Sequence, residues 1–205
     1  MNWLEEKMKK LRLMVDSDSV VVDLVGPWCE EYNKLYHDNL TPEKFGKDFG
    51  GIDKIVKPEC GKKVYDIFKQ EGFFENLKPL DGAIEGLEEL NKRHDLYIVT
   101  AYSGTPNSAK GKVAWYQNNC PFLDLDKSMI LIRDKFLLRG DVMIDDSLKN
   151  LKAFYEEQRL HRDVTDPFYT VCYSAPHNGN AAFENYVDFV AGNWSELLDV
   201  IHEIA

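Results

Sequence analysis

Two aspartates follow the apolar run "LRLMV", and their types and spacing could do chemistry. Asp16 and Asp18 lie in "LRLMVDSDSVVVDL", residues 11–24, which otherwise reads as a buried strand. Buried carboxylates are rare unless something pairs with them. Residues two apart can lie on the same side of an extended chain. Such a pair can supply a nucleophile and a general acid/base, which is the chemistry of hydrolysis through a covalent intermediate.

Three other apolar runs also end in polar residues. "LYIVT" ends in Thr100, "MILI" runs into "RDK" at 133–135, and "DVMI" runs into Asp145 and Asp146. Ligands bind at the carboxyl ends of parallel strands. Three carboxylates close together need a cation to stay ionised, and hard oxygen ligands suit Mg²⁺. Because a hydroxyl and an ammonium can hold phosphate oxygens, the set predicts metal-assisted phosphoryl transfer.

The elements that must position these residues alternate along the chain. Strands are predicted over residues 11–16, 95–103, 129–132, 141–146, 168–174 and 188–192, and helices over residues 26–39, 81–93, 108–119, 148–158 and 194–204. This alternation predicts an α/β fold, a parallel sheet covered on both faces by helices. Residues 46–80 read as a helical insertion, and Thr41 and Pro42 are expected to open a second helix over 41–45.

Composition excludes several classes of partner. A net charge of −10 disfavours binding to nucleic acid polymers, because like charges repel. No segment approaches the ~18 consecutive apolar residues of a membrane span. The start, "MNWLEEKMKKLRLMVD", does not resemble a signal peptide. The four cysteines are far apart in sequence and read as structural thiols of a reducing compartment, so a cytoplasmic protein is expected.

The order of these motifs resembles a known superfamily. "DSDSVV" at 16–21, Thr100, the downstream lysines and "MIDD" at 143–146 resemble the four motifs of the haloacid dehalogenase superfamily. More narrowly, the stretches "GFFENLKPLDGA" (72–83), "KVAWY" (112–116), "LIRDKFLLRGDVMIDD" (131–146) and "APHN" (175–178) resemble 5′(3′)-deoxyribonucleotidases of the bacterial and phage type. The resemblance implies a Rossmann-like three-layer α/β/α core, residues 1–24 and 79–205, with a small helical cap, 25–78, inserted after the first strand.

The same resemblance implies a role for each carboxylate. Asp16 matches the nucleophile and a Mg²⁺ ligand. Asp18 matches the general acid/base, and its backbone carbonyl would be a second ligand. Asp146 matches the remaining carboxylate on the metal, with Asp145 supporting it or replacing it. Ser19 stands where the family usually has Gly or Thr, so the turn is expected to persist.

The resemblance also implies residues that hold the substrate. Thr100 matches the phosphate-binding hydroxyl, and Lys135 the lysine that neutralises the phosphate, with Lys112 as its rival. Ala101 stands where the family often has Ser, which leaves only the backbone N–H. Leu24 stands where an aromatic side chain is common, so base stacking at that wall is in question.

Aromatic side chains of the insertion could stack on a base, although most are expected to form its core. They are Trp28, Tyr32, Phe45, Phe49, Phe73 and Phe74. Phe45 and, from a strand end, Arg133 are taken as substrate-binding residues. His177 is expected to satisfy its own loop, with substrate contact as the alternative.

Three functions compete. The first is a Mg²⁺-dependent phosphatase of nucleoside monophosphates, with 5′(3′)-deoxyribonucleotides preferred and an aspartyl-phosphate intermediate. The second keeps the chemistry but acts on a sugar phosphate or another small phosphorylated metabolite. The third is a non-catalytic, receiver-like phosphate-binding domain, which would lack the "DSD" spacing followed by a cap-sized insertion. The expected partner is a small phosphorylated substrate, and because related enzymes often dimerise, a homodimer is one option.

Overall fold

A six-stranded parallel sheet forms the centre of the molecule. The computed structural model describes residues 9–45 and 51–205. The strand order is β3-β2-β1-β4-β5-β6, and every pairing is parallel. The strands are β1 (Arg12–Val15), β2 (Asp95–Thr100), β3 (Met129–Leu131), β4 (Val142–Asp145), β5 (Tyr169–Tyr173) and β6 (Phe189–Ala191). The predicted α/β fold with a parallel sheet is confirmed.

Helices cover both faces of the sheet because buried parallel strands are apolar on both sides. On β1, Leu13 and Val15 join one apolar cluster, whereas Met14 joins the cluster on the opposite face. The first cluster includes residues of α2 (Ala83–Arg93), α3 (Pro106–Asn119) and α6 (Trp194–Ile204). The second includes Leu151 and Phe154 of α5 (Leu148–His161). The short helix α4 (Leu125–Ser128) precedes β3. The three predicted layers are therefore present.

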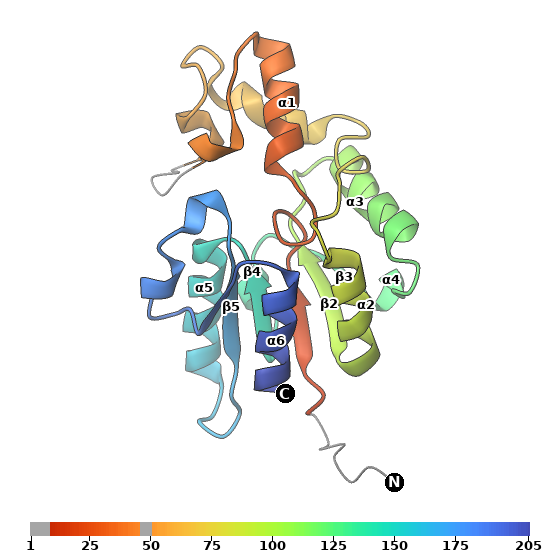
Figure 1. The fold of residues 1–205 in the computed structure, drawn as a ribbon, viewed down its shortest axis with the longest axis vertical. Coiled ribbons are helices and arrows are strands. Elements are labelled where there is room, and N and C mark those ends of the chain that lie inside the picture. Colours follow the sequence, from red (N-terminus) through yellow and green to blue (C-terminus); the bar gives the residue numbers. More distant parts are fainter. Residues whose placement is uncertain (1–8, 46–50) are drawn as a thin grey trace.

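The segment between β1 and α2 has an apolar cluster of its own. It contains α1 (Val25–Tyr36) and short 3₁₀ helices at Pro42–Lys44, Ile52–Lys54 and Gly61–Lys69. Figure 1 shows this segment beyond the carboxyl ends of β1 and β2. Trp28 and Tyr32 stack in its cluster with ring centroids 5.3 Å apart, and both are almost fully buried. Phe45 is buried in the same cluster, so three of the predicted aromatics form the core of the insertion, whereas Phe74 is buried in the sheet cluster that contains Leu13.

The prediction that an α-helix begins at residues 41–45 is wrong, because this segment forms only a short 3₁₀ turn. Only Pro42–Lys44 are helical, and they form a 3₁₀ turn. The Thr41 side chain accepts no capping hydrogen bond, and Phe45 leaves the helical region with ψ of 53°. Without a capped first turn, a short helix has little stability of its own. Phe49 and residues 1–8 lie outside the described residues.

All four cysteines, Cys29, Cys60, Cys120 and Cys172, are buried free thiols. None of the helices in residues 9–45 and 51–205 has the length and apolar character that crossing a membrane requires.

Candidate active site

The loop after β1 places two carboxylates at the carboxyl edge of the sheet. Asp16 follows the last residue of β1, and its backbone N–H donates to the carbonyl of Ile144 at 2.9 Å. The carbonyl of Ser17 accepts the N–H groups of Val21 and Val22, at 2.9 and 3.0 Å, so the loop turns back at once. Ser19 stands at the tip with φ of 59°, a left-handed conformation that a small polar residue tolerates. The turn expected around Ser19 is therefore present.

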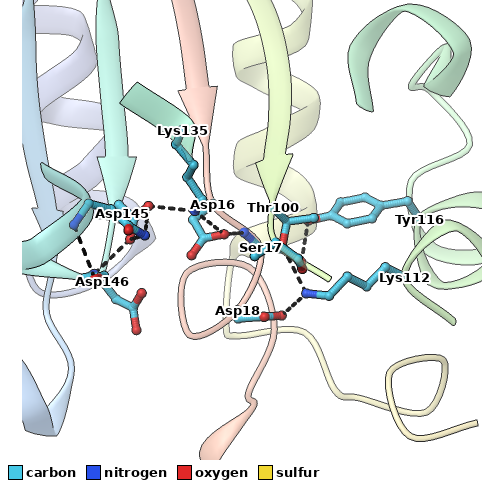
Figure 2. A network of polar contacts seen from close by, with 12 residues as sticks. Asp16, Ser17, Asp18, Thr100, Lys112, Tyr116, Lys135, Asp145 and Asp146 are labelled. Atoms are coloured by element: carbon cyan, nitrogen blue, oxygen red, sulfur yellow. Dashed lines mark hydrogen bonds and ion pairs between the residues drawn. The ribbon is translucent and has the colours of Figure 1, made fainter. Parts of the chain in front are cut away.

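Lys135 lies between two buried carboxylates. Its Nζ is 2.7 Å from Oδ1 of Asp16 and 2.7 Å from Oδ2 of Asp145 (Figure 2). Asp16, Asp145 and Asp146 each offer one oxygen, and these oxygens lie within 4.8 Å of one another. Burial would lower the pKa of Lys135, but Asp145 and Asp16 together raise it above its usual value, so the lysine is charged. We call Asp16, Asp145, Asp146 and Lys135 the carboxylate cluster.

Asp145 is surrounded by hydrogen-bond donors. Its Oδ1 accepts the Ser147 N–H at 2.9 Å, and both of its oxygens accept the Asn150 amide at 3.1 Å. With Lys135 on Oδ2, both oxygens are engaged. Burial is the main reason that the pKa of Asp145 is raised to about 7, and the charges of Asp16 and Asp146 raise it further. This pattern fits a residue that orients the cluster.

Lys112 forms the second ion pair of the site. Its Nζ, from α3, is 2.5 Å from Oδ1 of Asp18 and donates to Oγ1 of Thr100 at 3.0 Å. It also lies 4.4 Å from the centroid of the Phe74 ring. Burial raises the pKa of Asp18, Lys112 opposes that rise, and the charge of Asp16 adds to it. A raised pKa favours the protonated form of the carboxyl group, which is the form that a general acid needs in order to donate a proton. We call Asp18, Thr100 and Lys112 the acid/base cluster.

The structure brings both rival lysines to the site. Figure 2 shows Lys135 between Asp16 and Asp145, and Lys112 beside Asp18 and Thr100. Which of them neutralises a bound phosphate stays a prediction, because both are buried and both contact a predicted catalytic carboxylate.

Two contacts that no sequence motif indicates support the loop after β1. Tyr116 of α3 donates its hydroxyl to Oγ of Ser17 at 3.0 Å, between the two aspartates. Trp194 of α6 donates its indole N–H to the carbonyl of Val20 at 2.9 Å. The stretch "KVAWY" carries a family resemblance alone, and nothing in the local sequence indicates these partners, which are 99 and 174 residues away.

His177 lies against a predicted metal ligand. Its Nε2 is 3.0 Å from Oδ2 of Asp146. Asn178 donates its amide to the carbonyls of Asp146 and Tyr173, both at 2.8 Å. Burial would lower the pKa of His177, but the contact with Asp146 raises it on balance. His177 therefore contacts the site in addition to sitting in its loop.

One pocket reaches Asp18, and another reaches Asp146. One, of about 450 Å³, is lined mainly by apolar and aromatic side chains: Asp18, Leu24, Ile52, Tyr65, Phe68, Lys69, Phe74, Ala101, Tyr102, Ser103 and Arg133. We call it the aromatic pocket. The other, of about 520 Å³, includes Phe45, Asp146, Lys149, His177 and Asn178. Leu24 and Ile52 line both. Leu24, Ala101 and Arg133 thus share a pocket with Asp18, whereas Phe45 lies on the side of Asp146.

The carboxylate cluster fits a divalent cation. Three carboxyl groups gather at the strand edge, where Lys135 pairs with Asp16 and Asp145 and does not pair with Asp146. In the described residues, the polar contacts of Asp16 fall on Oδ1, from Lys135 and the Ser17 N–H. Its Oδ2 is therefore available to a ligand. Carboxylate oxygens are the donor type that Mg²⁺ prefers.

The fold is the one found in hydrolases of the haloacid dehalogenase type. A solved HAD family hydrolase from Deinococcus radiodurans, with bound phosphate and sodium, has the same fold, with a TM-score of 0.59. The alignment covers 94% of this chain and 95% of that chain at 14% identity. The chain belongs to the family described as "5′ nucleotidase, deoxy (Pyrimidine), cytosolic type C protein", which matches residues 9–204.

Curated relatives agree with that membership. The 5′(3′)-deoxyribonucleotidase of Clostridium acetobutylicum is 38% identical over 148 residues, 72% of this chain and 79% of the relative. The 5′(3′)-deoxyribonucleotidase of Bacillus subtilis (strain 168) is 30% identical over 190 residues, 93% of this chain and 97% of the relative. The predicted family resemblance and the predicted enzyme class, a hydrolase of the nucleotidase type, are confirmed.

Proposed function

We propose that this chain is a Mg²⁺-dependent phosphatase that hydrolyses nucleoside monophosphates, with 5′(3′)-deoxyribonucleotides as its preferred substrates. One observation carries the proposal: Asp18 lines the aromatic pocket and lies beside the carboxylate cluster that contains Asp16 (Figure 2). A leaving group in that pocket would have its oxygen next to an acid, and its phosphorus next to a nucleophile. The relatives named 5′(3′)-deoxyribonucleotidase support the choice of substrate.

The proposed reaction has two displacements. A carboxylate oxygen of Asp16 attacks phosphorus, the bond to the nucleoside oxygen breaks, and Asp18 gives its proton to that oxygen. Asp18 then takes a proton from water, which attacks phosphorus, releases phosphate and restores Asp16. Thr100 and the two lysines would hold the phosphate oxygens. Asp16, the Asp18 carbonyl and Asp146 would bind Mg²⁺, which when bound offsets the repulsion between the nucleophile and the phosphate.

The aromatic pocket supports a nucleoside as leaving group. Aromatic side chains offer flat faces on which a base can stack. Phe68 and Phe74 stack with ring centroids 6.1 Å apart, and Tyr65 and Tyr102 line the same pocket. Leu24 and Ile52 contribute aliphatic surface, and this aliphatic surface keeps a sugar phosphate as the second candidate substrate.

The proposal includes a role for residues 25–78. We assign them as a cap on the core formed by residues 1–24 and 79–205, because α1 and the 3₁₀ helices share an apolar cluster separate from the two sheet clusters. A cap excludes water from the reacting groups and contacts the part of the substrate that does not react. The family membership and this insertion, which a receiver domain would lack, disfavour the receiver-like alternative. The buried free thiols suit a cytoplasmic location, and homodimerisation stays a prediction.

Phosphate release from a substrate panel tests the proposal. The panel contains dUMP, dTMP, dAMP, the matching ribonucleotides and several sugar phosphates, each with Mg²⁺ and with EDTA. We expect Mg²⁺-dependent release, fastest with deoxyribonucleotides, and a loss of about 10⁴-fold or more in Asp16→Asn. Equal rates for wild type and Asp16→Asn would overturn the mechanism. Equal or faster turnover of sugar phosphates would overturn the substrate assignment and leave the mechanism in place.

A further inference from the structure

Asp146 differs from the other two acids of the carboxylate cluster in what holds its side chain. Among the described residues, the cation contacts of Asp16 and Asp145 both come from Lys135. The side chain of Asp146 instead meets the imidazole of His177, with Nε2 3.0 Å from Oδ2. His177 follows β5, so this contact joins two neighbouring strand ends of the sheet.

The turn that carries His177 is fastened to the backbone of Asp146. Asn178, 2% exposed, donates to the Asp146 and Tyr173 carbonyls at 2.8 Å, and its Oδ1 accepts the Ala175 N–H at 2.9 Å. The 3₁₀ turn Pro176–Asn178 is thus fixed at both ends. Because the backbone of Asp146 and the turn are tied together, the imidazole stays in register with the carboxylate.

A carboxylate ligand needs its plane and its lone pairs aimed at the cation. The terminal torsion of an aspartate is broad, so an unrestrained carboxylate samples many orientations. A hydrogen bond to one oxygen selects one of them and leaves the other oxygen available. In metal sites, such hydrogen bonds to a ligand side chain matter because they fix its orientation before the ion binds.

We propose that His177 is a positioning residue, which orients Asp146 as a ligand of the divalent cation and so sets the affinity of the site for that cation. The inference rests on the proposed function, because it takes Asp146 to be a metal ligand. A neutral imidazole with its proton on Nε2 is a sufficient donor, so the role needs no change in the charge of His177.

Metal affinity measured without substrate tests this role. Calorimetric titration with Mg²⁺, and with Mn²⁺ followed by its EPR signal, gives the affinity of wild type and variants. His177→Phe keeps a ring but removes the N–H, and we expect it to weaken binding by about 10- to 100-fold. His177→Gln keeps an N–H donor, and we expect affinity within about threefold of wild type, since the donor is the feature that matters. At saturating Mg²⁺, the KM for nucleotide should stay near the wild-type value.

A matched histidine elsewhere supplies the control. His161 on α5 pairs with Glu157, its Nε2 3.1 Å from Oε1, and its side chain is 69% exposed. His161→Phe removes the same type of contact away from the site, so metal affinity and thermal stability should both remain those of wild type.

The polar variants decide the outcome even if His177→Phe fails to fold. His177→Asn has an amide one methylene shorter, and it should lose about tenfold in affinity whereas His177→Gln does not. In addition, His177→Phe in an Asp146→Asn background should cost little further affinity, because the positioned ligand is already gone. Wild-type affinity in His177→Phe or His177→Asn would overturn the inference.

The two proposals fail in different ways. If wild type binds neither Mg²⁺ nor Mn²⁺, or if Asp146→Asn binds them as wild type does, the assignment of Asp146 as a ligand in the proposed function is wrong. If Asp146→Asn loses affinity while His177→Asn keeps it, the proposed function stands and only the positioning role falls.

Discussion

Lys135 and Lys112 are equally buried, with 2% of each side chain exposed, but their surroundings differ. Lys135 has a carboxylate oxygen at 2.7 Å on each of two sides. Lys112 has one carboxylate, one hydroxyl and the face of Phe74. Lys135 is therefore the cation that lets two buried acids coexist, whereas Lys112 pairs with a single acid. The same residue type thus serves two purposes at one sheet edge.

The largest effect should come from removing Lys135. Lys135→Met leaves Asp16 and Asp145 buried together without their cation, and we expect a loss of about 3–5 kcal/mol in the free energy of unfolding. Urea denaturation in EDTA measures it. Added Mg²⁺ should restore part of the loss, since a divalent cation offsets the same charges. A loss no larger than that of Lys112→Met would contradict the distinction drawn between the two lysines.

The pH dependence of the free energy of unfolding should reflect the raised pKa of Asp145 in the carboxylate cluster. The pKa of Asp145 is raised from 3.8 to about 7, by burial first and by its acidic neighbours next. Between these two values the folded state holds a proton that the unfolded state has released. Stability in EDTA should therefore fall as pH rises from about 4 to about 7, and level off above. Asp145→Asn should flatten this slope, whatever its effect on absolute stability; a slope like that of wild type would be the contrary result.

Removing Lys112 should cost less stability. Lys112→Met leaves Asp18 without its ion pair, but the Asp18 side chain is 25% exposed and water can solvate it. We expect a loss of about 1–3 kcal/mol in urea denaturation, typical of a charged group deprived of its hydrogen-bond partner. Lys110→Met, which removes an exposed lysine of the same helix from its pair with Glu71, is the control and should stay close to wild type. Matching losses in the two variants would show that burial of Lys112 adds nothing.

The smallest effect should come from His94, a buried base that no described carboxylate contacts closely. His94 accepts the Leu11 N–H on Nδ1 at 3.4 Å, and its buried Nε2 has no hydrogen-bond partner among the described residues. Burial lowers its pKa below 6.5, helped by the charges of His202 and Arg93. The folded state resists protonation, so stability should decline as pH falls below about 6.5, opposite in sign to Asp145.

His94→Asn keeps an acceptor and cannot gain a charge. The difference in melting temperature between this variant and wild type should shift in favour of the variant as pH is lowered from 7.5 to 5.5. A difference that does not change with pH would show that His94 titrates normally.

Local sequence patterns account for most of the strands and long helices. "LRLMV", "LYIVT" and "DVMI" are apolar runs short enough for strands, and their ends place Asp16, Thr100 and Asp145 at one edge because parallel strands share that edge. The prediction failed at Thr41, where a local capping signal had no long helix to stabilise.

The supporting contacts could not be read from the sequence. Tyr116 to Ser17 and His177 to Asp146 join residues that only the packing of the whole sheet brings together. Phe68 likewise lines the aromatic pocket, although the sequence around it gives no sign of that position. Each depends on the relative placement of elements, which residue types and spacing do not encode locally.

The hydrogen bond between Trp194 and Val20 can form only late in the synthesis of the chain. The indole N–H reaches the loop beside the first two acids only after 174 further residues have been translated. Trp194 fills space next to Gly86, where a Cβ would come within 2.3 Å of the indole, so a larger residue at position 86 would displace Trp194. A nascent chain still lacking α6 would carry every acid and lysine discussed above, with the loop that bears Asp16 and Asp18 missing that anchor. On the ribosome, this geometry is completed late.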